Sequence, residues 1–150
     1  MTTLTTKNSK TIKTTQASFE KPLPTVATST ITVKTCKEFK IDQKQVCLEF
    51  IGRNQISQAS SLCSLKHGKL PLPTNQKEND DYLNAFVTMM KEIGETRNTI
   101  VPLDVNDLVS EGHFVTYTGK TVEWFNWYSN QPDNWQNEDY VHMYVIIYDS

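Results

Sequence analysis

The stretch NQPDNWQNEDY, residues Asn130–Tyr140, gathers carboxylate and amide side chains around one proline and one tryptophan. A second oxygen-rich segment, VNDLVSEG, lies at residues 105–112. A hard cation such as calcium takes about six to eight oxygen ligands, which two such loops could supply together. Asp and Asn also populate ordinary turns, where they hydrogen-bond the local backbone. Both interpretations concern the same oxygen-bearing residues: Asp104, Asn106, Asp107, Glu111, Gln131, Asp133, Asn134, Asn137, Glu138 and Asp139.

Two known site types fit these residues poorly. An EF-hand starting at Asp104 would place Leu108 where the loop needs an oxygen ligand and Val109 where it needs glycine. A glycosidase pair needs two carboxyl groups at a defined separation, which a sequence does not give. The oxygen-rich segments therefore match neither site type, and composition alone favours the turn interpretation.

The composition predicts one soluble domain preceded by a tail. The chain has 150 residues, of which 37% are hydrophobic. No apolar run approaches the roughly 20 residues that span a bilayer. The opening MTTLTTKNSKTIKTTQ is polar where a secretory signal would be apolar, so no export signal is visible. Lysines are concentrated before residue 36, which leaves the remainder acidic and argues against nucleic-acid binding.

Residues 1–35 are rich in Thr, Ser, Lys and Pro and show neither helical nor strand periodicity. Such a segment buries too little apolar surface to offset the entropy of ordering, so we expect a disordered tail. An O-glycosylated stalk is the functional alternative for this composition. The folded domain is expected to span residues 36–150.

Periodicity predicts a hairpin, two helices and then several strands. CKEFKIDQKQVCLEFIG alternates about a polar turn, which would bring Cys36 and Cys47 within bonding reach. Helical spacing marks NQISQASSLCSLKHGKL, with Gly68 as its expected C-cap. In PTNQKENDDYLNAFVTMMKEIG we expect Asn75 as N-cap, Glu78 as its capping-box partner, Gly94 at the end, and a buried stripe of Tyr82, Leu83, Phe86, Val87 and Met90.

Short extended segments follow the second helix: TIVPLDV, HFVTYTG, TVEWFNW and YVHMYVIIY, separated by Gly, Asn, Asp and Pro. Two helices followed by strands predict an α+β fold. Trp124 and Trp127 are interpreted as core residues.

The segment NDLVSEGHFVTYTGKTVEWFNWYSNQPDNWQNEDYVHMYV resembles the second half of a C-type lectin-like domain. CLEF, SQASSLCSLKHGKL and NQKENDDYLNAF are similar to the opening strand and two helices of that family, and Cys36 and Cys47 fit its additional disulfide. The resemblance implies a calcium-dependent carbohydrate-binding module without catalysis, and an extracellular location.

The resemblance assigns residues to two calcium sites. Gln131, Asp133 and Glu138 match the principal site, where the ion also coordinates two sugar hydroxyls. The auxiliary calcium site is matched by Asp107, Glu111, Asn134 and Asp139. Pro132 matches a proline preceded by a cis peptide bond, which is energetically accessible before proline.

The Gln131-Pro132-Asp133 order resembles galactose binders of the family, because exchanging amide and carboxylate reverses which group donates to each sugar hydroxyl. Galactose and N-acetylgalactosamine are therefore the expected glycan class. Trp135 matches a tryptophan that covers the apolar face of galactose, and packing within the loop is the structural alternative.

The sequence departs from the family after Asp139. Tyr140 stands in place of a cysteine, and no segment matches the family's later calcium ligands or its closing strand with the final cysteine. The resemblance implies that Cys63 would pair with that final cysteine, so we expect Cys63 to be free and the opening strand to have an unpaired edge.

Two other functions stay open at this point. A lectin-like domain that binds protein, or a degenerate domain without sugar binding, would follow from the missing ligands and cysteines. A cysteine hydrolase using Cys63 and His67 is a third possibility, although a helix face offers no oxyanion hole by itself. No zinc site is expected, since three cysteines without a CxxC pair lack the usual ligand set.

Overall fold

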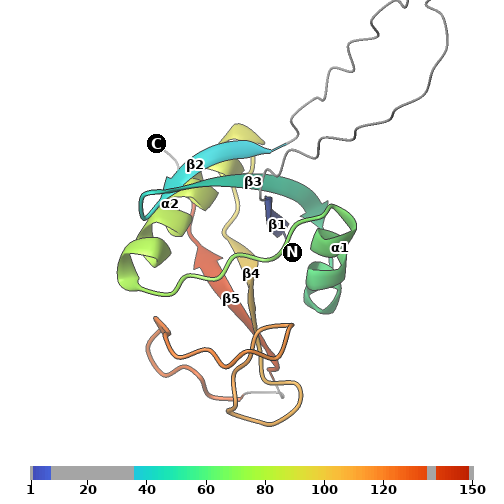
Figure 1. The fold of residues 1–150 in the computed structure, drawn as a ribbon. Coiled ribbons are helices and arrows are strands. Elements are labelled where there is room, and N and C mark those ends of the chain that lie inside the picture. The colour runs from blue at the N-terminus through green and yellow to red at the C-terminus, as the bar shows by residue number, and fades with distance from the viewer. Residues whose placement is uncertain (1, 8–35, 135–137, 149–150) are drawn as a thin grey trace, which may run out of the picture.

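The computed structural model describes residues 2–7, 36–134 and 138–148, and confirms an α+β fold with antiparallel strands. One sheet has three strands in the order β1-β3-β2, from Thr2–Lys7, Lys44–Arg53 and Lys37–Ile41. A second sheet pairs β4, Thr99–Asn106, with β5, Tyr140–Val145. Figure 1 shows the long loops gathered at one end of the β4–β5 pair, away from the three-stranded sheet.

The β2–β3 hairpin forms as the alternating sequence predicts. Phe39 pairs with Val46 and Ile41 with Lys44, which leaves Asp42 and Gln43 as the two turn residues. Both turn residues have positive φ, as the common two-residue hairpin turn requires. Cys36 and Cys47 form the expected disulfide across the hairpin, with Cα atoms 5.4 Å apart. Cys63 is buried and takes no part in a disulfide bond, also as expected.

The prediction of a disordered tail is wrong for Thr2–Lys7. These residues form β1 and pair antiparallel with β3, with Thr5 opposite Glu49. The expectation of an unpaired edge on the opening strand is wrong for the same reason, because β3 is paired on both sides. Strand formation here depends on the hydrogen-bonding edge of β3, which no local periodicity reveals, and β-branched threonine suits a strand. Residues 8–35 lie outside the described part of the chain.

The first helical segment combines a 3-10 turn, η1 Ile56–Gln58, with helix α1, Ala59–Leu65. The expected glycine cap is misplaced by one residue, since His67, and not Gly68, has the positive φ. His67 N–H donates to Ser64 and Gly68 N–H to Cys63, a Schellman arrangement. Ala59, Cys63 and Leu70 form a small core beneath this helix.

Helix α2, Gln76–Glu92, begins and ends at the predicted residues. The Asn75 side chain accepts a 2.9 Å hydrogen bond from the Glu78 N–H. The buried Glu78 carboxylate accepts from Thr74, both N–H and hydroxyl, and from the Lys44 ammonium. Burial alone would raise the pKa of Glu78, but the bonds from Lys44 and Thr74 outweigh it and hold that pKa below its ordinary value. Gly94 ends the helix with positive φ.

The main core lies between α2 and the strands. The predicted stripe packs there, with Tyr82, Phe86 and Met90 buried and Leu83 and Val87 partly buried. Among the described residues, none of the helices is both long enough and apolar enough to cross a bilayer. The remaining buried members of this core are Ile41, Leu48, Ala85, Met89, Val101, Leu103, Val105, Met143 and Val145.

Two of the four predicted extended segments are not strands. HFVTYTG and TVEWFNW make only isolated bridges, from Val115 to Asn106 and to Thr121. Phe114, Phe125 and Trp127 from these segments pack against one another instead. Ring packing and a few backbone hydrogen bonds, among them Val122 N–H to the Phe114 carbonyl, therefore hold these two segments without a regular strand ladder. Their alternating sequence pattern is one that a strand would also have.

The pairing of β1 with β3 predicts that proline in β1 destabilises the domain. Neighbouring strand residues direct their N–H groups to opposite sides. The double substitution Leu4→Pro and Thr5→Pro therefore removes at least one donor that faces β3. We expect a loss of about 1–3 kcal/mol in the free energy of unfolding, measured by denaturant titration, and faster amide exchange in β3. The matched control is Thr14→Pro with Thr15→Pro, and equal behaviour of the two variants would contradict the pairing.

Candidate functional site

The β4–β5 pair brings the two oxygen-rich segments together. Asn106, the last residue of β4, lies opposite Tyr140, the first residue of β5. The Asp107 N–H then donates to the Asp139 carbonyl at 3.2 Å. The loop after β4 and the segment before β5 thus leave the sheet side by side. Because of this register, residues of the loop after β4 meet residues of the segment before β5, although the two lie more than twenty positions apart in the sequence.

Asp107 carries the least satisfied carboxylate of the site. Asp107 is buried, with only 3% of its surface exposed. Atom Oδ2 accepts a 2.9 Å hydrogen bond from the Gly112 N–H, while the buried Oδ1 has no hydrogen-bond partner. A buried acceptor without a partner costs free energy, more so when it is charged. A cation or a donor at Oδ1 would remove that cost.

Glu111 lies close enough to the other predicted auxiliary residues to be affected by them. The pKa of Glu111 is raised, first of all by desolvation. The charge of Asp107, a hydrogen bond between the Asp107 and Glu111 carboxyl groups, and the charge of Asp139 raise it further. A hydrogen bond with Asn134 acts in the opposite direction and lowers it. The carboxylates of Asp107, Glu111 and Asp139 therefore lie within electrostatic reach of one another, with the Asn134 side chain beside Glu111. A bound cation would relieve the repulsion among the three carboxylates.

The donor chemistry of this cluster fits calcium, since carboxylate and amide oxygens are the ligands that calcium prefers. Its charged groups are nevertheless more widely spread than a metal shell. Within residues 2–7, 36–134 and 138–148, no group of three or more His, Cys, Asp or Glu side chains is close enough to hold a metal ion. Bound calcium would therefore draw these side chains inward.

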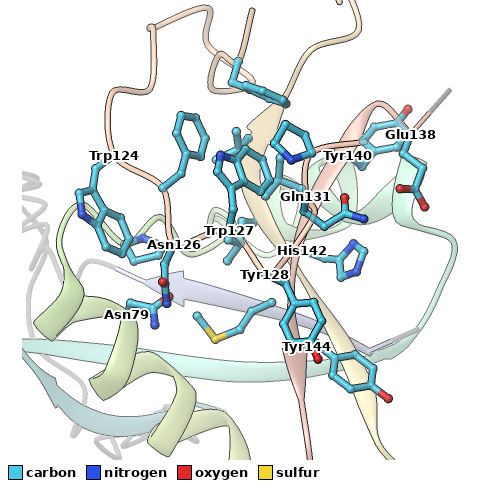
Figure 2. A pocket seen from close by; sticks show the side chains of 18 of the residues that line it. Asn79, Trp124, Asn126, Trp127, Tyr128, Gln131, Glu138, Tyr140, His142 and Tyr144 are labelled. Carbon is cyan, nitrogen blue, oxygen red and sulfur yellow. The ribbon is translucent and has the colours of Figure 1, made fainter. Parts of the chain in front are cut away.

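The predicted principal site is only partly assembled. The Gln131–Pro132 peptide bond is cis, as predicted, and lies between Asn130 and Asn134, which both have positive φ. The Gln131 N–H donates to the Tyr128 carbonyl at 2.9 Å, which closes a tight turn. Gln131 and Glu138 line one cavity (Figure 2).

Two members of the predicted sugar site are not placed at that cavity. Asp133 is exposed and does not contribute to the cavity lining, although it has interactions elsewhere. Trp135 falls at residues 135–137, which are outside the described part of the chain.

The cavity itself was not predicted from the sequence. It has a volume of about 740 Å³ and lies between α2, the β4–β5 pair and residues 124–129. Figure 2 shows Trp127 and Tyr128 on the same cavity as Gln131, Tyr140 and Tyr144. Trp124 and Trp127 are half-buried and line this cavity, so their predicted core role is only partly realised. The clustering of rings in EWFNWY is the sequence signal that could have indicated it.

Cys63 and His67 do not form a reactive pair in this structure. Cys63 is fully buried in the small core under α1. His67 is exposed in the turn that ends the helix. A nucleophilic thiol needs both access to substrate and a base within hydrogen-bonding reach. Because Cys63 is buried, a substrate has no access to its thiol, and the first requirement is not met.

Three curated relatives share sequence with this chain. The alpha-N-acetylgalactosamine-specific lectin of Patiria pectinifera is 31% identical over 102 residues, which covers 65% of this chain and 58% of that lectin. Lectin BRA-3 of Megabalanus rosa is 32% identical over 61% of this chain and 50% of its own length. The C-type lectin domain family 3 member A homolog of Xenopus laevis is 30% identical over 56% of this chain and 41% of its own length.

The chain thus spans about half the length of the curated relatives it matches. No protein-family profile matches the chain. Among solved structures, the carbohydrate-recognition domain of the mouse scavenger receptor C-type lectin matches at a TM-score of 0.43 and 21% identity, over 60% of this chain and 64% of that one.

The unsatisfied carboxylate predicts opposite effects of Asp107→Asn with and without calcium. In chelator we expect the melting temperature to rise by a few degrees, because the substitution removes a buried charge beside Glu111. In calcium we expect the ion-induced rise in melting temperature to disappear, because a ligand is lost. Glu123→Gln, at an exposed position outside the two oxygen-rich segments, is the control. If the Asp107→Asn variant keeps the full calcium-induced rise in melting temperature, Asp107 is not a calcium ligand.

Proposed function

We propose that this chain is a C-type lectin-like domain with a calcium-dependent carbohydrate-binding function. The observation that carries the proposal is the meeting of the two oxygen-rich loops at the end of β4 and β5. There a buried Asp107 carboxylate oxygen lacks a partner, and Glu111 lies beside it with a raised pKa that desolvation and the charges of Asp107 and Asp139 produce. Such a cluster is unfavourable by itself and is stabilised by a cation.

Two groups of residues would take part. Asp107, Glu111, Asn134 and Asp139 would hold an auxiliary ion that fixes the two loops together. Gln131, Asp133 and Glu138 would hold the principal ion, with Trp135 beside the sugar. Calcium would supply coordination positions for vicinal sugar hydroxyls, while the protein's carboxylates accept and its amides donate hydrogen bonds to those hydroxyls. The domain binds and performs no covalent chemistry.

Galactose and N-acetylgalactosamine are the proposed glycan class. The order of amide and carboxylate in Gln131-Pro132-Asp133 supports this choice, and one of the relatives is named as an alpha-N-acetylgalactosamine-specific lectin. The same family context supports an extracellular location.

A lectin-like domain that binds a protein ligand, without sugar binding, is the second candidate. It is favoured by one observation, namely that the described residues do not gather three charged metal ligands within coordinating distance. The two candidates differ in their response to calcium.

The proposed function is tested by retention of the full chain on galactose-agarose. We expect retention in millimolar calcium and release by a chelator, because the sugar hydroxyls coordinate the ion. A thermal melt under the same two conditions should show a single transition that calcium raises, by linkage between binding and folding. A cooperative melt without any response to calcium, together with equal elution in both buffers, would favour the protein-binding candidate.

The proposed specificity predicts a switch for Gln131→Glu combined with Asp133→Asn. This exchange keeps the net charge but reverses donor and acceptor, so galactose retention should fall and mannose retention should rise, each at least about tenfold. The matched control exchanges the same groups on the exposed face of α2, Gln76→Glu with Asp80→Asn. Unchanged preference in the loop variant would assign specificity to other residues.

A further inference from the structure

The cavity next to the candidate sugar site extends well beyond the residues that would bind sugar. Its volume of about 740 Å³ falls within the range of ligand sites, about 300–1,000 Å³. Side chains with oxygen atoms contribute to its lining, among them Asp107, Glu111, Gln131, Asn134 and Glu138. The rest of the lining comes mainly from apolar and aromatic side chains, among them Leu83, Val105, Phe125, Trp127, Val141 and Met143.

One wall of this cavity is held in place by ring packing. Phe125 stacks on Trp127 with ring centroids 4.8 Å apart. Phe114 contacts both, at 5.2 Å from Phe125 and 5.1 Å from Trp127. Aromatic groups in mutual contact at these separations support one another and resist collapse into the cavity. The apolar wall is therefore a formed surface that a ligand can meet without first rearranging it.

Apolar side chains of the lining also reach solvent. Tyr128 is 83% exposed, Tyr144 55% and Ile146 39%. All three belong to the cavity lining, and Figure 2 places Tyr128 and Tyr144 on the side that also holds Gln131 and His142. Large apolar side chains that gather at the opening of a cavity mark an interaction site. Water now covers an apolar surface that is continuous with the polar residues of the candidate sugar site.

We propose that this cavity accepts the apolar aglycone of a glycoconjugate, so that the ligand is a galactoside carrying an alkyl chain next to the sugar. The inference rests on the proposed function, because the sugar is the part that the oxygen-rich loops hold. The alkyl end of such a ligand matches the aromatic wall of Phe114, Phe125 and Trp127, and its sugar end matches Gln131 and Glu138, which line the same cavity. Removing that chain and wall from water supplies affinity that the sugar alone does not have.

The test compares methyl and hexyl β-galactoside by calorimetry with the full chain in calcium. We expect hexyl β-galactoside to bind at least about tenfold more tightly than the methyl compound. Hexyl β-glucoside, with the same chain on a different sugar, should bind at least about tenfold more weakly than hexyl β-galactoside.

Two tyrosines provide a matched pair of variants. Tyr144→Ser shortens the apolar wall and should remove most of the preference for the hexyl compound while leaving methyl β-galactoside binding unchanged. Tyr148→Ser alters a tyrosine that is 73% exposed but does not line the cavity, so the preference should stay. Tyr128→Ser, outside any strand, repeats the test if the Tyr144 variant folds poorly.

The outcomes separate this inference from the proposed function. Equal affinity for methyl and hexyl β-galactoside, with both lost in chelator, overturns the aglycone site and leaves the lectin function standing. Hexyl compounds that bind in chelator irrespective of their sugar, with no binding of methyl β-galactoside, overturn both, because the cavity would then be an apolar site unconnected with a sugar.

Discussion

The register that sets Asn106 opposite Tyr140 is the constraint on which the candidate site depends. It makes the backbone of Asp107 bond to that of Asp139, so that the loop after β4 and the segment before β5 leave the sheet together. A shift by one residue would turn alternate side chains to the opposite face. Met143 and Val145 would then leave the core, and the packing of the hydrophobic core therefore fixes the positions of the polar loops.

The cost of this arrangement is concentrated in a few carboxylates. The β4–β5 register and the bond from the Asp107 N–H to the Asp139 carbonyl hold Asp107, Glu111 and Asp139 near one another, where their charges repel. The protein tolerates this because the cluster lies at the edge of the fold, and among its described carboxylates only Asp107 has a buried oxygen without a hydrogen-bond partner. An arrangement of this kind is common at binding sites, where the ligand supplies what the protein alone lacks.

Local signals in the sequence predicted the elements that depend on local chemistry. The Asn75 cap, the Gly94 terminus and a polar turn between the two hairpin strands each follow from neighbouring residues, and the structure has all three. The paired residues Thr2–Lys7 were missed because their partner is distant in sequence. HFVTYTG alternates like a strand, yet its rings pack on those of the next segment, so periodicity alone did not distinguish the two. The loop residues were found through family resemblance, whereas the cavity beside them arises from tertiary packing that no motif encodes.

The pairing of β1 with β3 has a consequence for how the chain folds. Thr5 and Glu49 are separated by most of the first third of the sequence, so their contact closes a large loop, whose entropic cost grows with the logarithm of its length. The β2–β3 hairpin closes a turn of two residues and needs no such closure. We therefore expect the β2–β3 hairpin to form before β1 joins the sheet, although β1 precedes the hairpin in the chain.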